Sequence, residues 1–174
     1  MQTPAPAPLR TASPLRRSHR LWRVLAPLAV VAVTATGCYG GGGGGGGGSG
    51  EMGQLLQRVN EVRASNGRGP LAWCPTLANA ASKHSKDMSS HGFMGHVGSD
   101  GSTFTQRANA HGYVRWTRLT ENVAAGQSSV DSVLANWLAS PLHAANILDP
   151  TVNHAGFGRA GNHWTQVFGA NGTC

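Results

Sequence analysis

The stretch that most restricts the possible folds is residues 163–169, His-Trp-Thr-Gln-Val-Phe-Gly. Side chains of a β-strand alternate between its two faces, so a strand here turns Trp164 and Phe168 to one face and Val167 to the other. Large apolar groups on both faces predict a central strand that is covered on both sides. Its His and Gln need hydrogen-bond partners, because burying polar groups without partners costs free energy. We expect these partners among three upstream side chains, those of His96, Glu121 and His143.

The N-terminal part predicts export. Residues 1–23 are rich in Pro and Arg and contain no acid, and an apolar run at 24–36 follows. This order predicts a secretory signal over 1–37, and the apolar run is too short to span a bilayer comfortably as a helix. The small residues before Cys38 resemble a bacterial lipobox, which predicts lipidation of Cys38 and a membrane-anchored lipoprotein. The alternative is ordinary cleavage after Gly37, which would release a secreted protein.

The next segment and the cysteine count favour the anchored form. Residues 40–48 are all Gly, and such a run acts as a flexible tether, which we place at 38–51. Lipidation of Cys38 leaves Cys74 and Cys174 as the remaining pair of the three cysteines. In an oxidising compartment this pair can form a disulfide. It would close a loop of about 100 residues and stabilise the fold by about 4 to 5 kcal/mol in the chain-entropy model.

The charge distribution argues against a nucleic-acid partner. Five of the 14 basic residues precede residue 24, whereas all seven acidic residues follow residue 50. The remainder therefore has nine basic and seven acidic residues, without the basic stripe that is typical of nucleic-acid-binding proteins. We expect one globular domain after the leader, and we expect it to be a monomer.

Hydrophobic periodicity and turn residues place helices early and strands late in the globular part. The segment 121–124 is expected to be short and extended or irregular. The order of elements predicts an α+β fold with helices packed on an antiparallel sheet. The expected helices cover 51–66, 75–90, 102–111 with Ser102 as its cap, a segment after the cap Ser129, and a turn over 142–148 after Pro141; the expected strands cover 155–160 and 163–169, joined as a hairpin.

The sequence contains no nucleophile elbow, no His-Glu-x-x-His, no P-loop and no Cys-x-x-Cys. Acidic residues are scarce, so a site with two catalytic carboxylates is hard to assemble. The remaining candidates are His96, Glu121, His143 and His163. Each of them alone is more typical of structural hydrogen bonding, as is His84 on the apolar face of its helix, but together they indicate a site.

Many short motifs follow one another in the order of a known family. The order resembles the CAP superfamily of cysteine-rich secretory, antigen 5 and pathogenesis-related 1 proteins, whose domain is also called SCP, and the bacterial extracellular branch is most similar. The resemblance implies a CAP/SCP domain over 52–174, folded as a three-layered α-β-α sandwich with a cleft over a central antiparallel sheet. The motifs include Gly95-His96, Asp100-Gly101-Ser102, Glu121-Asn122-Val123-Ala124, Ser140-Pro141-Leu142-His143, Asn146-Ile147-Leu148 and the whole of 163–169.

The resemblance also implies which residues line the cleft, which commonly holds two His and two Glu. His96 matches the first His, Glu121 the first Glu, and His163 the second His. Ser140 stands where the second Glu is found, so this chain lacks one carboxylate of the pattern. His143 matches a His of the bacterial branch.

Three functions are open for these residues. The first is a binding module, for which the resemblance implies small apolar ligands such as lipids in some members and protein or cell-surface partners in others. The second is a Zn²⁺ site of His96, His163 and Glu121 with an open position for a hydrolytic water. The third is a purely structural hydrogen-bond network. We favour the binding module over an enzyme, because the loss of the second Glu weakens the case for hydrolysis.

Overall fold

The computed structural model describes residues 50–174, which are built on a four-stranded sheet. The order of the strands in the sheet is β1-β3-β4-β2, so β4 is a central strand, as the alternation of residues 163–169 predicts. The strands are β1 (Ala72–Trp73), β2 (Arg118–Ala125), β3 (His154–Ala160) and β4 (His163–Ala170).

The pairing of the strands confirms the hairpin and corrects two details. β3 and β4 are antiparallel, and β2 pairs antiparallel with β4 along its whole length, so the segment around Glu121 is a regular strand of eight residues. The predicted antiparallel pairing is confirmed for β2, β3 and β4, and the short strand β1, for which no strand was expected, pairs parallel with β3. A strand of two residues, as in β1, is too short to show the alternation of apolar and polar side chains from which a strand is predicted.

Five helices complete the described part, close to their predicted places. The Ser129 side chain accepts a hydrogen bond from Ser132 N at the start of the fourth helix, as predicted. The third helix is capped by Thr103 rather than Ser102, because the Thr103 hydroxyl accepts from Gln106 N in a capping box. The helices are α1 (Glu51–Ser65), α2 (Pro75–His91), α3 (Phe104–Ala110), α4 (Val130–Ala139) and α5 (Pro141–Ile147).

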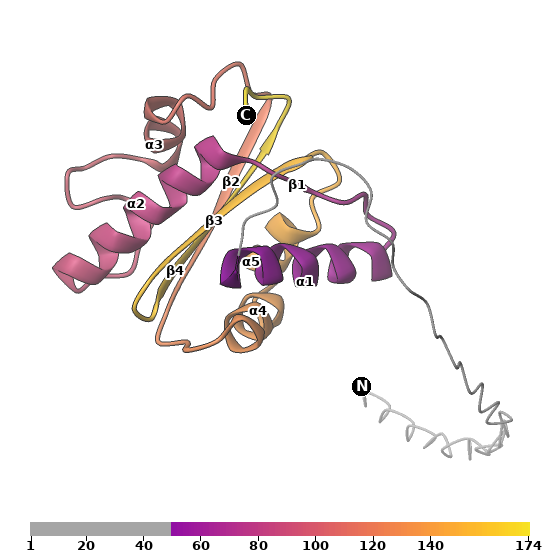
Figure 1. Cartoon of the computed structure of the whole chain (residues 1–174), viewed down its shortest axis with the longest axis horizontal. Helices are drawn as coiled ribbons and strands as arrows, with labels where there is room; N and C mark the ends of the chain where they lie inside the picture. Colours follow the sequence, from indigo (N-terminus) through magenta and orange to yellow (C-terminus); the bar gives the residue numbers. More distant parts are fainter. Residues whose placement is uncertain (1–49) are drawn as a thin grey trace, which may run out of the picture. The chain divides into compact units, whose positions relative to one another are not determined.

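The helices cover both faces of the sheet and give the three-layered α-β-α arrangement (Figure 1). On one face, Trp164 and Phe168 of β4 pack in a core with side chains of α1, α4 and α5, including Trp137. On the other face, Val167 packs with Leu77 of α2. The alternation that the sequence shows along residues 163–169 is therefore the alternation between two separate cores.

The leader lies outside the described residues. The signal over 1–37, the lipidation of Cys38 and the Gly run at 40–48 therefore stay predictions. Within residues 50–174, no helix has the length and apolar character that a bilayer span requires.

The α2 layer lies unusually close to β3, because β3 turns glycines toward it. A Cβ built on Gly156 would collide with backbone atoms of Leu77 and Ala78, and one built on Gly158 would collide with the backbone of Ala81 and Ser82. These two glycines let the helix backbone rest on the strand backbone.

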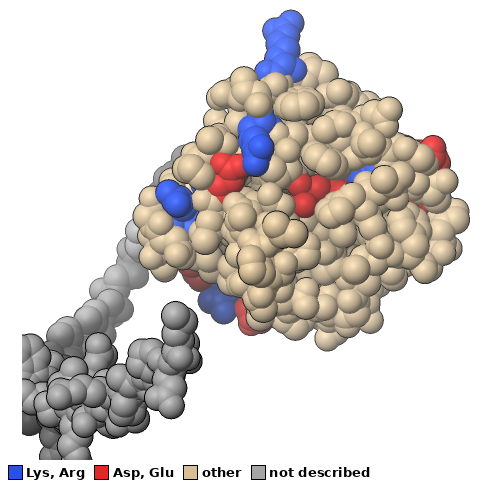
Figure 2. All heavy atoms as spheres, turned by 180° about the vertical axis from the view of Figure 1, so that it is seen from behind, with Lys and Arg blue, Asp and Glu red and all other residues tan. Residues whose placement is uncertain are grey.

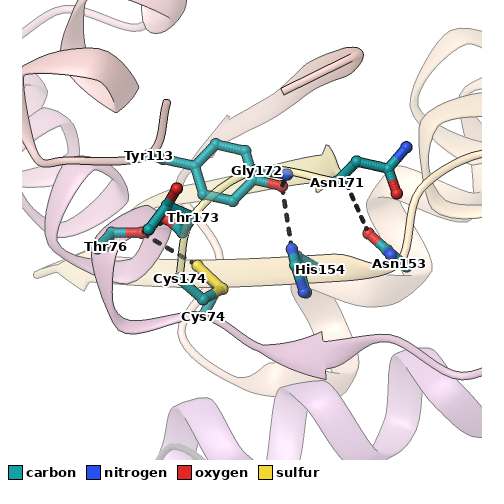
Figure 3. Close-up of a disulfide and its surroundings, with 9 residues drawn as sticks. All are labelled: Cys74, Thr76, Tyr113, Asn153, His154, Asn171, Gly172, Thr173 and Cys174. Atoms are coloured by element: carbon teal, nitrogen blue, oxygen red, sulfur yellow. Dashed lines mark hydrogen bonds between the residues drawn. A yellow bond between two sulfur atoms is a disulfide. The ribbon is translucent and has the colours of Figure 1, made fainter. Parts of the chain in front are cut away.

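A disulfide joins Cys74 to Cys174, as the cysteine count predicts, and the two Cα atoms are 5.2 Å apart (Figure 3). The bridge ties the segment after β4 to the first residue before α2. Beside it, the buried Tyr113 hydroxyl accepts a hydrogen bond from Gly172 N and lies 3.1 Å from His154 Nδ1. The end of the described chain is therefore fixed by both a covalent and a polar contact.

The contact between α2 and β3 can be tested with Gly156→Ala. We expect a loss of about 3 kcal/mol or more in the free energy of unfolding, because the new methyl group meets backbone that cannot move aside. Urea unfolding measures this loss. Gly69→Ala is the matched control, since no heavy atom lies within 4 Å of its Cβ. An unchanged unfolding midpoint for Gly156→Ala would contradict the close approach of the two layers.

Candidate functional site

The loop between α2 and α3 carries His96 and is held in place from inside the molecule. α2 ends at Gly92, whose positive φ of 67° reverses the chain direction. The next fixed point is Gly95, whose carbonyl accepts a hydrogen bond of 2.7 Å from Nε2 of the fully buried His84. His84 therefore has the structural role that the sequence predicts for it.

The centre of the site is the carboxylate of Glu121, whose side chain is 1% exposed. Its Oε1 atom accepts a hydrogen bond of 3.0 Å from His96 Nδ1, and its Oε2 atom accepts one of 2.9 Å from Arg107 Nη2. His96 lies on the loop, Glu121 on β2 and Arg107 on α3, so three elements meet at one carboxylate. The structure thus brings together His96 and Glu121, as predicted.

Arg107 is a site residue that the sequence reasoning missed. Its guanidinium is buried and also donates to two loop carbonyls, to Ser102 O at 2.6 Å and to His96 O at 2.9 Å. It therefore neutralises Glu121 and fixes the backbone of His96 at the same time. In the sequence, Arg107 looks like any basic residue of a short surface helix. Its role follows from the side of α3 that faces β2, and this orientation depends on the tertiary structure.

The histidines in and around the site differ in the direction in which their pKa is shifted. The hydrogen bond that His96 donates to the Glu121 carboxylate raises the pKa of His96, whose side chain remains 51% exposed. Burial lowers the pKa of His84. Burial also lowers the pKa of His143, and the positive charge of a protonated His96 lowers it further.

A second polar network lies directly behind Glu121, on the opposite face of β2. Asn122 Nδ2 donates to Gln166 Oε1 and to His143 O, each at 3.1 Å. Asn146 Nδ2 donates to Asn122 Oδ1 at 2.8 Å and to Glu121 O at 3.2 Å. The partner of Gln166 is therefore Asn122, which corrects the expectation that a His or Glu side chain would fill this role; His143 contributes only its carbonyl.

The remaining predicted residues do not join the carboxylate. His163 lies opposite Ala125 in the β2–β4 register, whereas Glu121 lies opposite Val167. The separation of four positions corresponds to about 13 Å along the strand. The Nδ1 atom of His163 is buried without a hydrogen-bond partner. Ser140 lies at the junction of α4 and α5, where its backbone carbonyl accepts from the fifth helix.

The predicted zinc site is not supported by this geometry. In residues 50–174, no group of three or more His, Cys, Asp or Glu side chains is arranged to hold a metal ion. His96 Nδ1 and both carboxylate oxygens of Glu121 are engaged with protein partners, and His163 lies too far along β4 to complete a set. The three residues therefore do not fit a three-ligand zinc centre.

Comparison with known proteins identifies similar chains. The model of the cysteine-rich secretory protein family, CAP, matches residues 56–168. The uncharacterized protein YkwD of Bacillus subtilis (strain 168) is 31% identical over 116 residues, which cover 65% of this chain and 44% of that protein.

Solved structures share the fold. An extracellular protein containing an SCP domain from Bacillus anthracis has a TM-score of 0.65 at 29% identity, covering 68% of this chain and 39% of that one. An outer surface protein of Borrelia burgdorferi has a TM-score of 0.62 at 20% identity, covering 69% and 92%, respectively. This chain spans less than half the length of both Bacillus proteins.

The dependence of Glu121 on Arg107 can be tested by a double-mutant cycle. Arg107→Met leaves a buried carboxylate without its cation, and we expect a loss of about 3 to 5 kcal/mol in the free energy of unfolding. Adding Glu121→Gln removes the charge and should restore a large part of this loss. Arg58→Met, at an exposed ion pair, should leave the urea midpoint nearly unchanged. Strictly additive losses in the double variant would show that the two side chains are not coupled.

The raised pKa of His96 predicts the sign of a pH effect. A group whose pKa is higher in the folded than in the unfolded state stabilises the fold fully below the unfolded value of about 6.5, and this contribution disappears as the pH rises through the folded pKa. The stability difference between wild type and His96→Ala should therefore shrink from about pH 6 to about pH 8. Burial shifts the pKa of His84 and of His143 in the opposite direction, and these burial contributions cancel in the difference because both residues are present in both proteins. Urea unfolding at both pH values gives the difference, and growth of that difference with pH would contradict the assignment.

Proposed function

Because the chain belongs to the cysteine-rich secretory protein family, CAP, we propose that it is an exported binding module whose His96 contacts a small ligand or a surface partner. One observation carries this proposal. An imidazole that is half exposed is fixed by a buried carboxylate and a buried guanidinium, which themselves do not face solvent. Such an arrangement presents one polar group outward in a defined orientation.

The geometry favours binding over hydrolysis. His96 uses Nδ1 on Glu121, so the Nε2 side of the ring is the part left for a ligand. Glu121 is the only carboxylate that the described residues place on His96, and Arg107 already neutralises it. Glu121 itself is held by two donors, so it is not free to act as a nucleophile or as a second general base beside His96.

Export is supported by separate observations. The Bacillus anthracis protein with a similar structure is described as extracellular. A disulfide such as Cys74–Cys174 persists in an oxidising compartment. Together with the expected signal over 1–37, these observations support export, and we extend the proposal to a lipid anchor at Cys38 followed by the Gly tether.

Native mass spectrometry of the protein purified from its exported location tests the proposed function. We expect wild type to retain a non-covalent small molecule that His96→Ala loses, while His91→Ala, which changes another exposed histidine, keeps it. The same spectra report whether Cys38 carries an acyl group. Equal retention by wild type and His96→Ala, or no bound molecule in either, would contradict a binding role for His96.

A further inference from the structure

Residues 171–174, which we call the strap, follow β4 and pass over the ring of Tyr113 (Figure 3). A Cβ atom built on Gly172 would lie 2.4 Å from atoms of this ring, and one built on Gly169 of β4 would lie 2.3 Å from its hydroxyl oxygen. The strap and β4 therefore both press on Tyr113, which is 0% exposed. The strap covers a residue that water would otherwise reach.

Apart from the disulfide, polar contacts hold the strap. Its sequence, Asn-Gly-Thr-Cys, contains no large apolar side chain. Hydrogen bonds near the surface contribute little net stability because water replaces them, whereas ordering each residue costs conformational entropy. The disulfide is therefore what keeps the strap in place. The hydrogen bonds of the strap, which are 3.0 to 3.3 Å long, run from Asn171 N to Asn153, Asn171 Nδ2 to Thr117, Gly172 N to Tyr113, Thr76 Oγ1 to Thr173 O and Thr173 N to Val114 O.

The two cysteines of the bridge have different surroundings. Cys74 is fully buried, whereas Cys174 is exposed. Cys74 is the N-cap residue of α2, a helix of 17 residues, and no side chain caps this end. The Thr76 hydroxyl oxygen lies 3.1 Å from Cys74 Sγ. A helix N-terminus and a hydroxyl donor both stabilise a thiolate, so Cys74 is the better leaving group and Cys174 is the accessible end of the bridge.

Thr76 connects the strap to this sulfur. Its hydroxyl has one proton, which it can donate either to Thr173 O of the strap, at 3.3 Å, or to Cys74 Sγ. Departure of the strap removes the competing carbonyl and leaves this proton for the sulfur. Release of the strap and stabilisation of a Cys74 thiolate therefore favour each other.

We propose that Cys174 is a site of thiol–disulfide exchange and that this exchange releases the strap. The thiolate of an external thiol attacks Cys174 Sγ, its electron pair forms the new S–S bond, and the electron pair of the old bond leaves with Cys74 as a thiolate. The product carries a mixed disulfide on Cys174 and has Tyr113 uncovered. No residue of the site around His96 takes part, so this inference does not depend on the proposed function.

A dithiol carries the exchange to completion. Its second thiol attacks its own sulfur in the mixed disulfide, and Cys174 leaves as a thiolate that takes up a proton. The dithiol is then oxidised by two electrons to a disulfide, and the bridge of the protein is reduced by the same two electrons. In the oxidising compartment expected for an exported protein, the bridge is closed by default and opens where a thiol is supplied.

Charge does not restrict which thiols reach Cys174. The face drawn in Figure 2 shows Lys, Arg, Asp and Glu side chains in small separate groups. The strap has no charged side chain, and the chain after residue 24 has nine basic and seven acidic residues. Without a strong field of one sign, small anionic thiols and protein thiols can both approach.

Peptide mapping of the exported chain carrying Cys38→Ser tests the direction of exchange, because this variant retains only Cys74 and Cys174. The probe is reduced glutathione, and early time points are quenched with iodoacetamide and digested with trypsin, which separates peptide 69–83 from peptide 160–174. We expect glutathione on Cys174 and the carbamidomethyl group on Cys74, in at least about tenfold excess over the opposite arrangement. Equal amounts of both arrangements, or glutathione mainly on Cys74, would overturn the proposal.

A second probe separates the sources of the thiol. Reduced thioredoxin in which the second active-site cysteine is replaced by serine forms a stable mixed disulfide and therefore traps the exchange. Faster reaction with this protein than with glutathione assigns the exchange to a protein dithiol, and faster reaction with glutathione assigns it to a small thiol. Reaction with neither probe would show that the bridge is inert.

Thr76→Val tests the role of the hydroxyl donor. This variant should slow the exchange about threefold or more, because the leaving thiolate loses a donor. Thr117→Val is the matched control, since it removes another hydroxyl that bonds to the strap but does not contact the sulfur, and its rate should stay within about twofold of the rate of the parent chain. Equal rates in the two variants would contradict the assignment of Thr76.

Hydrogen–deuterium exchange tests release of the strap. After reduction with tris(2-carboxyethyl)phosphine, the amides of Gly172 and Thr173 should lose protection while α2 and β3 stay protected. In the double variant Cys74→Ala/Cys174→Ala, nitration of Tyr113 by tetranitromethane should rise at least about tenfold over the bridged chain, because the ring becomes exposed. Loss of protection throughout residues 50–174 would show that the bridge holds the whole domain, and unchanged protection of the strap would show that its hydrogen bonds suffice; either result overturns the proposal.

Discussion

The arrangement of this domain depends on one charge that is kept out of water. A carboxylate as deeply buried as that of Glu121 is unfavourable by several kcal/mol unless a cation and hydrogen-bond donors compensate it. Arg107 supplies the cation from α3, and His96 supplies the second donor from the loop. The requirement to satisfy two oxygens therefore fixes the helix, the loop and the strand relative to one another, and it leaves His96 as the group that meets solvent.

The edge strand β2 carries polar networks on both of its faces. Apolar residues at these positions could not form the hydrogen bonds that hold the loop, α3 and α5. Glu121 points toward the loop and α3, and its neighbour Asn122 points toward α5 and Gln166. Amide groups such as these are stable inside a protein only when they bond one another or the backbone. The loop and α5 are thus attached to consecutive residues of a single strand, one on each of its faces.

Local patterns predicted the parts of the structure that depend on local physics. The alternation of residues 163–169 predicted a strand with two covered faces, and Ser129 predicted a helix start. Features that depend on tertiary placement were not accessible. Ser102 and Thr103 are both good caps, and only the geometry selects Thr103. The distance of His163 from Glu121 follows from the strand register, and the role of Arg107 follows from the side of α3 that faces β2. Neither the strand register nor the orientation of α3 can be read from the spacing of residues in the sequence.

The contact of α2 with Gly156 and Gly158 has a consequence for motion. Side chains that separate two layers allow small shear movements, because they can change rotamers as the layers slide. At Gly156 and Gly158 no side chains separate α2 from β3, since the two backbones are in contact. Sliding or rolling of α2 would make its backbone collide with that of β3, so α2 and β3 move as one rigid unit. Any displacement of His96 must therefore arise in the loop after Gly92 rather than in α2.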